Sequence, residues 1–178
     1  MEKIFENELL ILKQPSLEDE TAILDCLNEF IDNDLKFYGD GGLSKFANFE
    51  DWLGYLKQCA SKNPPNNFVT STQFITIHKP TGRVIGAINI RHFLNDILLK
   101  HGGHIGYSIR PSAQRQGFGD LQLQLALKFC KEIGLEKVLV TCKTSNIASQ
   151  KTILKNGGVL ENILNVDGED FYRFWIAL

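Results

Sequence analysis

The segment from residue 103 to residue 142 places two strand-like runs on either side of a long amphipathic helix. Within residues 117–133 the apolar side chains recur at helical spacing and form one stripe, made of Phe118, Leu121, Leu125, Phe129 and Ile133. Gly134 follows directly, where a glycine commonly ends a helix. The flanking runs at residues 103–109 and 138–142 are typical of strands, and the second is almost wholly apolar. This strand–helix–strand order favours an α/β domain built on a central sheet.

Strand-like and helix-like stretches alternate along the rest of the chain as well. Runs with strand character lie at residues 9–13, 68–78, 84–91, 159–166 and 171–177. Stretches with helical periodicity lie at residues 16–31, 49–60 and 146–156. A length of 178 residues suits one domain with its own core, and the chain shows no internal repeat or linker. We therefore predict a single α/β domain over residues 1–178 with a central mixed sheet.

The loop between the strand at residues 103–109 and the long helix carries the strongest chemical signal. Its sequence from Gln114 to Gly119 is Gln-Arg-Gln-Gly-Phe-Gly. Glycines leave backbone N–H groups unshielded, and a helix start adds unpaired N–H groups and the positive end of the helix dipole. Arg115 adds a formal positive charge. The loop therefore suits a diphosphate, although a tight turn that merely needs glycine is the alternative.

Two other phosphate-binding motifs fit this loop poorly. A P-loop needs Lys and Ser or Thr directly after its last glycine, and none follows here. A dinucleotide-binding fingerprint needs a third glycine where this chain has Gln122. A nucleotide-binding domain that uses the same loop is therefore a weak alternative.

Composition excludes several other classes of function. The net charge of −2 gives no reason to expect nucleic-acid binding. The chain has no apolar run of about 18 residues and no signal sequence, so we expect a cytoplasmic protein without membrane contact. The four cysteines are far apart and are expected to be buried thiols. Neither the cysteines nor the histidines have the spacing of metal ligands, so we expect no metal.

Residues 107–119 resemble the pyrophosphate-binding motif of the GNAT acyltransferases. The run Val-Leu-Val-Thr-Cys at residues 138–142, followed by Asn146 and Gly157, is similar to the next motif of that family. The resemblance covers nearly the whole chain and is most specific at residues 103–160. It implies a mixed sheet of six to seven strands flanked by about four helices, in which the fourth and fifth strands, at residues 103–109 and 138–142, splay apart.

The family likeness implies that acetyl-CoA is the acyl donor and that its pantetheine arm lies between the splayed strands. The residues implied to bind it are Tyr107, Ser108, Ile109, Gln114, Arg115, Gln116, Gly117, Phe118, Gly119, Asp120, Asn146 and Ser149. The backbone of residues 107–109 would pair with the pantetheine, and the amides of residues 115–120 would hold the pyrophosphate. Asn146 is also a plausible helix cap. Asp120 departs from the family pattern, and we expect its carboxylate to point to solvent.

The implied reaction is direct attack of a primary amine on the thioester, which needs a base for the amine and an acid for the sulfur. The family's usual acid and base positions hold Ile153 and Thr141 here. His104 and Tyr107 are the local candidates, although a regular strand would put them on opposite faces unless a bulge intervenes. Both also have structural interpretations. Further candidates for the acid or a water relay are Ser149 and Tyr172, and a water chain without a dedicated base is a further alternative.

The acceptor amine is the least defined part of the prediction. Arg91 could bind an acceptor carboxylate, or could be an ordinary charge at a strand end. A small-molecule amine and a peptide or protein amine both remain open, and the net charge slightly favours a cationic acceptor. A homodimer through the C-terminal strands is expected. The alternative to an N-acetyltransferase is a non-catalytic acyl-CoA-binding sensor.

Overall fold

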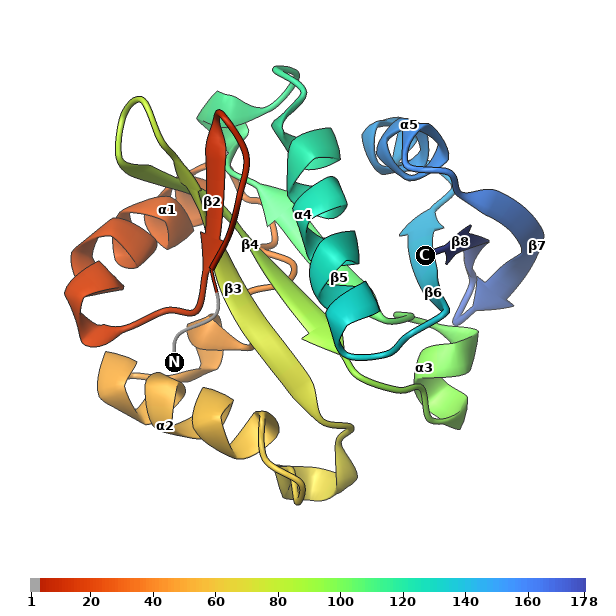
Figure 1. Ribbon diagram of the computed structural model, residues 1–178, viewed down its shortest axis with the longest axis horizontal. Helices are drawn as coiled ribbons and strands as arrows, with labels where there is room; N and C mark the ends of the chain where they lie inside the picture. Colours follow the sequence, from red (N-terminus) through yellow and green to blue (C-terminus); the bar gives the residue numbers. More distant parts are fainter. Residues whose placement is uncertain (1–3) are drawn as a thin grey trace.

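The computed structural model describes residues 4–178, which form two antiparallel sheets and five α-helices (Figure 1). The larger sheet has the strand order β1-β2-β3-β4-β5, and the smaller has the order β6-β8-β7. The strands are β1 Ile4–Glu6, β2 Leu10–Lys13, β3 Ser71–His78, β4 Arg83–Arg91, β5 Ile105–Ile109, β6 Lys137–Lys143, β7 Val159–Val166 and β8 Glu169–Ala177. The helices are α1 Glu20–Asp32, α2 Phe49–Cys59, α3 Asp96–Lys100, α4 Phe118–Glu132 and α5 Ile147–Lys155.

Helices cover both faces of the larger sheet. The apolar stripe of α4 packs on one face, where Leu125 and Phe129 lie in a core that also contains Phe74 of β3. Helices α1 and α2 pack on the other face, in a second core that includes Phe30 and Trp52. Because both faces are covered, the side chains of β3 are buried over most of its length. Figure 1 shows α4 crossing in front of this sheet and α5 beside β6.

Strands β5 and β6 meet only at their beginnings and then belong to different sheets. At the meeting point the backbone N–H of His104 donates to the Leu139 carbonyl at 2.7 Å. Gly103, with a φ of 60°, lies so close that an added Cβ would be 2.4 Å from the same carbonyl oxygen. Only glycine meets both requirements, so Gly103 sets the point from which the two strands diverge.

Every helix and strand predicted from the sequence is present, and the mixed α/β class is confirmed. The strand count differs slightly, since eight strands form two sheets instead of one sheet of six or seven, and all ladders are antiparallel. Strand β1 and helix α3 were not predicted because each is only three to five residues long. Between residues 4 and 178 no helix has both the length and the apolar character that crossing a membrane requires.

Candidate active site

The loop from the end of β5 to the start of α4 has left-handed backbone at two positions. Arg115 has a φ of 61° and Gly117, the N-cap of α4, has a φ of 83°. The side chains from Gln114 to Gly117 are exposed. Left-handed residues turn successive backbone N–H groups toward one side, which is the arrangement of an anion-binding nest.

The backbone N–H groups of this nest are available to an anion. Those of residues 115–117 make no backbone hydrogen bond within residues 4–178, and the first N–H groups of α4 have no partner inside the helix. The positive end of the α4 dipole adds to their attraction for negative charge. A Cβ on Gly117 would meet nothing within 4 Å, so the space in front of the loop is open. These residues fit a diphosphate.

Most side chains of the loop form hydrogen bonds within the loop or pack in the core. Gln114 donates from Nε2 to the Ile109 carbonyl at 2.9 Å, and Gln116 donates to a carbonyl earlier in the loop at 3.2 Å. Phe118 is buried against the core. Arg115 is exposed and has no ion pair among the residues described. The predicted phosphate contacts therefore fall to the backbone and to the Arg115 charge.

Arg110 anchors the start of the loop, a role that the sequence did not reveal. Its buried guanidinium donates from Nε to Glu29 at 2.7 Å, and from Nη1 to Asp25 and to the Val84 carbonyl, each at 3.0 Å. Glu29 also accepts a hydrogen bond from the Ser112 N–H at 2.5 Å. These bonds tie the loop to α1 and fix the direction of its N–H groups.

Asp120 differs from its prediction. Its carboxylate is only 6% exposed, where it forms an ion pair with Lys155 and accepts from Asn156 Nδ2 at 2.7 Å. Its backbone N–H donates to the Gly117 carbonyl at 3.2 Å and is therefore already engaged. The expectation that the carboxylate points to solvent is wrong because the end of α5 supplies a cation and an amide donor there. This pairing offsets the negative charge beside the nest.

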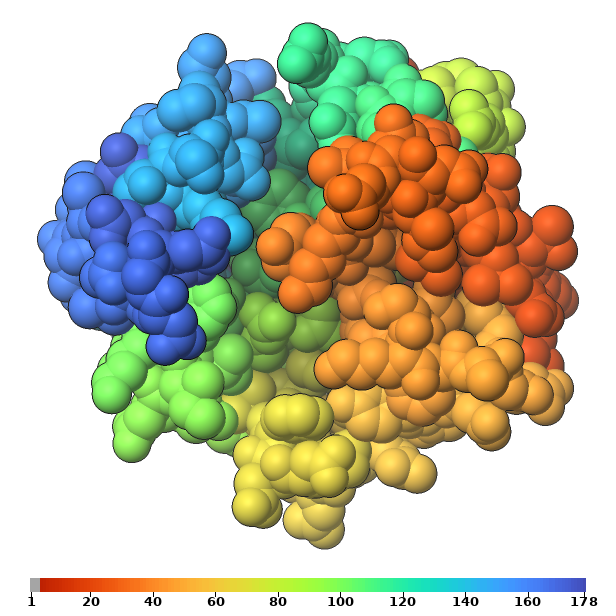
Figure 2. Space-filling view, turned by 180° about the vertical axis from the view of Figure 1, so that it is seen from behind, coloured from red at the N-terminus to blue at the C-terminus, as the bar shows by residue number. Residues whose placement is uncertain are grey.

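The free edge of β5 borders a groove. Strand β5 is the outer strand of the larger sheet, so among residues 4–178 no strand pairs with the edge that faces β6. Seen from behind, the surface is hollowed between the orange segment near residue 40 and the blue C-terminal segment, over a green floor (Figure 2). An extended ligand can add to such an edge as a further strand.

Tyr107 of β5 and Ser149 of α5 are brought together by the fold. The Tyr107 hydroxyl lies 3.0 Å from Ser149 Oγ, and the Ser149 N–H donates to Asn146 Oδ1 at 3.0 Å. Burial raises the pKa of Tyr107 to about 12, so its hydroxyl keeps its proton at neutral pH. Asn146 is thus the N-cap of α5, and three of the predicted site residues form one connected group.

His104 points away from this group and is held by the backbone of β6. The Leu139 N–H donates to His104 Nδ1 at 2.9 Å, and the ring is 5% exposed. Burial and then the Arg91 charge lower the pKa of His104 to about 4. Strand β5 pairs with β4 without a register shift, so the bulge that would turn His104 and Tyr107 to one side is not present within residues 105–109. The geometry gives His104 a structural role, and its role as a base stays a prediction.

The positions where the family usually carries its acid and base hold structural residues. Thr141 Oγ1 accepts a hydrogen bond from the Gly102 N–H at 3.2 Å. Ile153 is fully buried in the main core. Tyr172 lies on β8 opposite Cys142 and is partly buried against the same core. Tyr107 therefore has the best placed hydroxyl of the sequence-based candidates.

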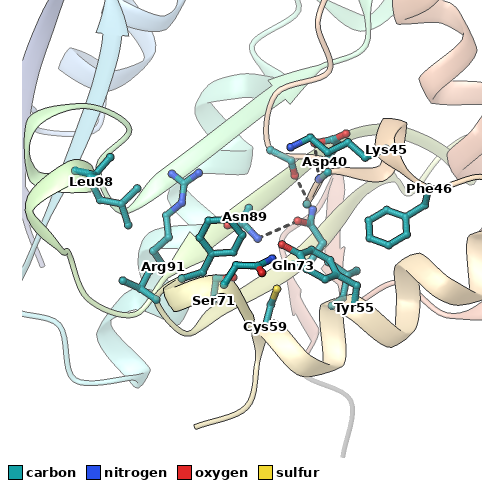
Figure 3. A pocket seen from close by; sticks show the side chains of 18 of the residues that line it. Asp40, Lys45, Phe46, Tyr55, Cys59, Ser71, Gln73, Asn89, Arg91 and Leu98 are labelled. Atoms are coloured by element: carbon teal, nitrogen blue, oxygen red, sulfur yellow. Dashed lines mark hydrogen bonds between the residues drawn. The ribbon is translucent and has the colours of Figure 1, made fainter. Parts of the chain in front are cut away.

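A cavity of about 550 Å³ lies on the α1–α2 side of the larger sheet (Figure 3). Its floor is formed by polar side chains of β3 and β4, namely Ser71, Gln73, Asn89 and Arg91. Its walls come from the segment after α1, from α2, from residues 66–69 and from α3. Arg91, the predicted acceptor-binding residue, lies in this cavity.

The cavity reaches the strand that borders the groove. Gly39, in its wall, has a φ of 76°, and an added Cβ would lie 2.3 Å from the Gly106 carbonyl oxygen of β5. Ser108 of β5 donates from Oγ to the Tyr38 carbonyl at 2.6 Å. The segment after α1 is therefore packed directly on β5.

Sequence reasoning missed Gln73 and Asn89 of the cavity floor. Both are polar residues inside strands that are otherwise buried. A polar residue at such a position is a sequence signal that could have indicated a cavity. Metal binding has no support in the residues described, where no group of three His, Cys, Asp or Glu side chains could hold an ion. All four cysteines are buried and free, as expected.

The family described as the acetyltransferase (GNAT) domain matches residues 10–159 of this chain. The chain belongs to the GNAT acetyltransferases. This assignment confirms the family likeness drawn from the loop and from the order of the elements. Among curated protein sequences, none matches the chain.

Solved structures with the GNAT fold resemble this chain over almost its whole length. The Salmonella typhimurium acetyltransferase that modifies the N-terminal serine of ribosomal protein L7/L12 is 16% identical, with a TM-score of 0.67 and 99% of each chain covered. RimL in complex with coenzyme A is 15% identical, with a TM-score of 0.70 and coverage of 99% of this chain and 98% of its own. The self-immunity acetyltransferase MccE, in complex with acetyl-CoA and AMP, is 18% identical, with a TM-score of 0.68 and coverage of 97% and 94%. At these identities the likeness concerns the fold.

Proposed function

We propose that this GNAT protein transfers an acetyl group from acetyl-CoA to a primary amine. The observation that carries this proposal is the nest of unpaired N–H groups at the start of α4, directly after the outer strand β5. A pyrophosphate at the nest leaves the free edge of β5 for the pantetheine arm. Acetyl-CoA supplies the acyl group as a thioester, whose carbonyl carbon the amine attacks directly.

Most of the predicted donor-binding residues have a role in this proposal, whereas Gln114 and Asp120 serve the fold. The N–H groups of residues 115–119 and the Arg115 charge bind the pyrophosphate, and the backbone of residues 107–109 pairs with the pantetheine. Asn146 keeps Oδ1 on the Ser149 N–H, which leaves its amide Nδ2 to donate toward the groove. A backbone N–H on the free edge of β5 stabilises the developing oxyanion.

Tyr107 supplies the proton for the leaving sulfur. As the new N–C bond forms and the C–S bond breaks, the sulfur takes a proton from the Tyr107 hydroxyl, and Ser149 relays a replacement. The amine loses its own proton to water in the cavity, since His104 Nδ1 is occupied by the Leu139 N–H. The acceptor enters through the cavity that contains Arg91, and both small-molecule and peptide amines are within this proposal.

The assay is amine-dependent release of the coenzyme A thiol by the wild type and by Tyr107→Phe. General acid catalysis typically contributes about 100-fold or more, so we expect kcat to fall by about 100-fold with little change in acetyl-CoA affinity. Tyr38→Phe is the matched control, because Tyr38 is exposed and contributes only its backbone carbonyl to β5. Equal kcat values for Tyr107→Phe and the wild type would refute the role of Tyr107.

The alternative function is acyl-CoA binding without catalysis. It is motivated by Thr141 and Ile153, which occupy the family's usual base and acid positions with side chains committed to the fold. It predicts tight acetyl-CoA binding with no amine-dependent thiol release for any acceptor, and the same assay therefore separates the two functions.

The expected homodimer also belongs to this proposal. Strand β7 is the outer strand of the smaller sheet, and Val159, Leu160 and Ile163 on it are each about half exposed or more. An exposed apolar outer strand favours pairing with another chain. Sedimentation of the wild type and of Ile163→Lys tests this, because a dimer through β7 should dissociate in the variant.

A further inference from the structure

Arg91 is partly buried and, unlike the buried Arg110 and Arg173, has no acidic partner within residues 4–178. Arg110 and Arg173 each form ion pairs with glutamate side chains. Arg91 instead donates from Nη1 to the carbonyl oxygens of Gly102 at 3.1 Å and Gly103 at 3.3 Å, and no carboxylate within residues 4–178 pairs with it. Burial lowers the pKa of Arg91. A desolvated guanidinium at a cavity wall is stabilised by a bound anion.

Asn89 lies next to Arg91 on the cavity floor and is held in one orientation. Its Nδ2 donates to Gln73 Oε1 at 3.1 Å, and Gln73 Nε2 donates to the Gly39 carbonyl at 2.6 Å. This chain of bonds uses one of the two Nδ2 hydrogens of Asn89 and fixes the amide plane, and Oδ1 accepts no hydrogen bond within residues 4–178, so it can accept one from a ligand (Figure 3). Asn89 and Arg91 are two residues apart on one strand face, about 7 Å between their Cα atoms.

The pair lies against the strand where acyl transfer is proposed. Asn89 pairs with Gly106 of β5, and a Cβ added to Gly106 would lie 3.3 Å from Arg91 Nη2. A side chain at that position would therefore crowd the guanidinium, and Gly106 leaves the approach from the cavity to β5 open. A group bound at Arg91 is consequently close to the backbone that faces the groove.

The cavity has a local positive charge although the whole chain has a net charge of −2. Arg91 and Lys45 line it, against a single carboxylate, that of Asp40. The Asp40 oxygens already accept from the N–H groups of Gly42 at 2.9 Å and Ser44 at 3.4 Å. The local charge therefore favours an anionic ligand, in contrast to the cationic acceptor that the net charge slightly favours.

We propose that the acceptor is a small amino acid-like molecule, with a primary amine and a carboxylate a few bonds apart. Arg91 binds the carboxylate, and Asn89 Oδ1 accepts a hydrogen bond from the amine and directs it toward β5. This inference rests on the proposed acetyl transfer and adds the class of acceptor.

The test compares amino acids with their carboxamides as acceptors. A series with one to four carbons between amine and carboxylate is assayed for thiol release, each member beside its carboxamide and beside a short peptide with a free N-terminus. We expect at least one amino acid to exceed its carboxamide by tenfold or more in kcat/KM. We expect Arg91→Met to abolish that preference. Arg83→Met is the matched control, since Arg83 lies at the other end of β4 and is exposed.

A second variant covers the case in which Arg91→Met fails to fold. Asn89→Asp keeps the size of the side chain and places a negative charge beside Arg91, so it should lower kcat/KM for amino acids more than for carboxamides. Circular dichroism establishes that each variant is folded before it is assayed.

Each outcome decides between the acceptor class and the reaction. Equal kcat/KM for amino acids and carboxamides, a higher value for the peptide, or an unchanged preference in both variants would overturn the acceptor class and leave acetyl transfer standing. Failure of every amine to release thiol would overturn the proposed reaction together with this inference.

Discussion

Protonation of His104 should couple the stability of this protein to pH. The ring is buried, and Nδ1 accepts from the Leu139 N–H, so the neutral imidazole with its proton on Nε2 is the form that fits. Protonating Nδ1 would set two N–H groups against each other at the point where β5 and β6 meet. We therefore expect acid to weaken the junction between the two sheets.

The direction and size of this change in stability follow from the pKa of His104, which is lowered from an ordinary 6.5 to about 4. Between these values the unfolded chain binds a proton that the folded chain does not bind. The stabilising contribution is therefore complete above about pH 6.5 and is lost as the pH falls toward 4. Each unit of difference is about 1.4 kcal/mol, so the loss between pH 7.5 and pH 4.5 is about 2–3 kcal/mol.

Urea unfolding of the wild type and of His104→Asn at these two pH values measures the effect. The asparagine in the variant does not titrate. Between pH 7.5 and pH 4.5 the free energy of unfolding should therefore fall by about 2–3 kcal/mol less in the variant than in the wild type. His101→Asn is the control, because His101 is exposed. The same pH dependence in His104→Asn and the wild type would refute the reasoning.

The activity of His104→Asn tests the sequence-based role of His104 as a base. A catalytic base gives a fall in kcat/KM below its own pKa, so a His104 base with a pKa of about 4 would give the wild type a fall toward that pH which the variant lacks. The structural role predicts that both proteins share one shape of pH profile. A limb that disappears only in His104→Asn would restore His104 as the base.

Two further substitutions test particular contacts by urea unfolding. Gly103→Ala should cost about 3 kcal/mol or more, because its φ of 60° and a carbonyl oxygen 2.4 Å from the new Cβ both oppose a side chain. Gly134→Ala is the control, because Gly134 has a φ of 84° and open space around an added Cβ, so that only backbone strain opposes the substitution. It should cost about 1 kcal/mol. Equal losses of stability in Gly103→Ala and Gly134→Ala would contradict the close contact at Gly103. Asp120→Asn should cost about 1–2 kcal/mol because it removes the charge that pairs with Lys155, and a stability equal to that of the wild type would show that the pairing is unimportant.

The regular elements were predictable because their periodicity is local. The stripe through Leu125 and Phe129 identified α4, and strand-like runs identified seven of the eight strands. Strand β1 was not predicted because three residues are too few to show a strand periodicity. The burial of Phe5 depends on its packing against Phe74 and Phe129, which are distant in the sequence. The division into two sheets depends on the contact of Gly103 with a distant strand, which no local pattern shows.

The glycine-containing loop before α4 was predictable from the sequence, and the cavity on the other face of the sheet was not, because one is contiguous and the other is not. The nest is a contiguous stretch in which Gly117 and the start of α4 act together, so its chemistry is visible in the sequence. The cavity joins Gly39, Gln73 and Asn89 from three separate segments through hydrogen bonds and strand pairing. The environment of Asp120 likewise depends on α5, and the expectation for that carboxylate was therefore wrong.

Binding of acetyl-CoA at the nest is tested most directly by calorimetric titration of acetyl-CoA into the wild type, Gly117→Trp and Gly134→Trp. Both glycines have left-handed backbone, with a φ of 83° and 84°, and open space around an added Cβ, so the variants are matched for backbone strain. Only the side chain at residue 117 would cover the nest. We expect micromolar binding by the wild type and Gly134→Trp, and loss of that binding in Gly117→Trp. Unchanged binding in Gly117→Trp, or no binding of acetyl-CoA and longer acyl-CoAs by the wild type, would contradict binding at the nest.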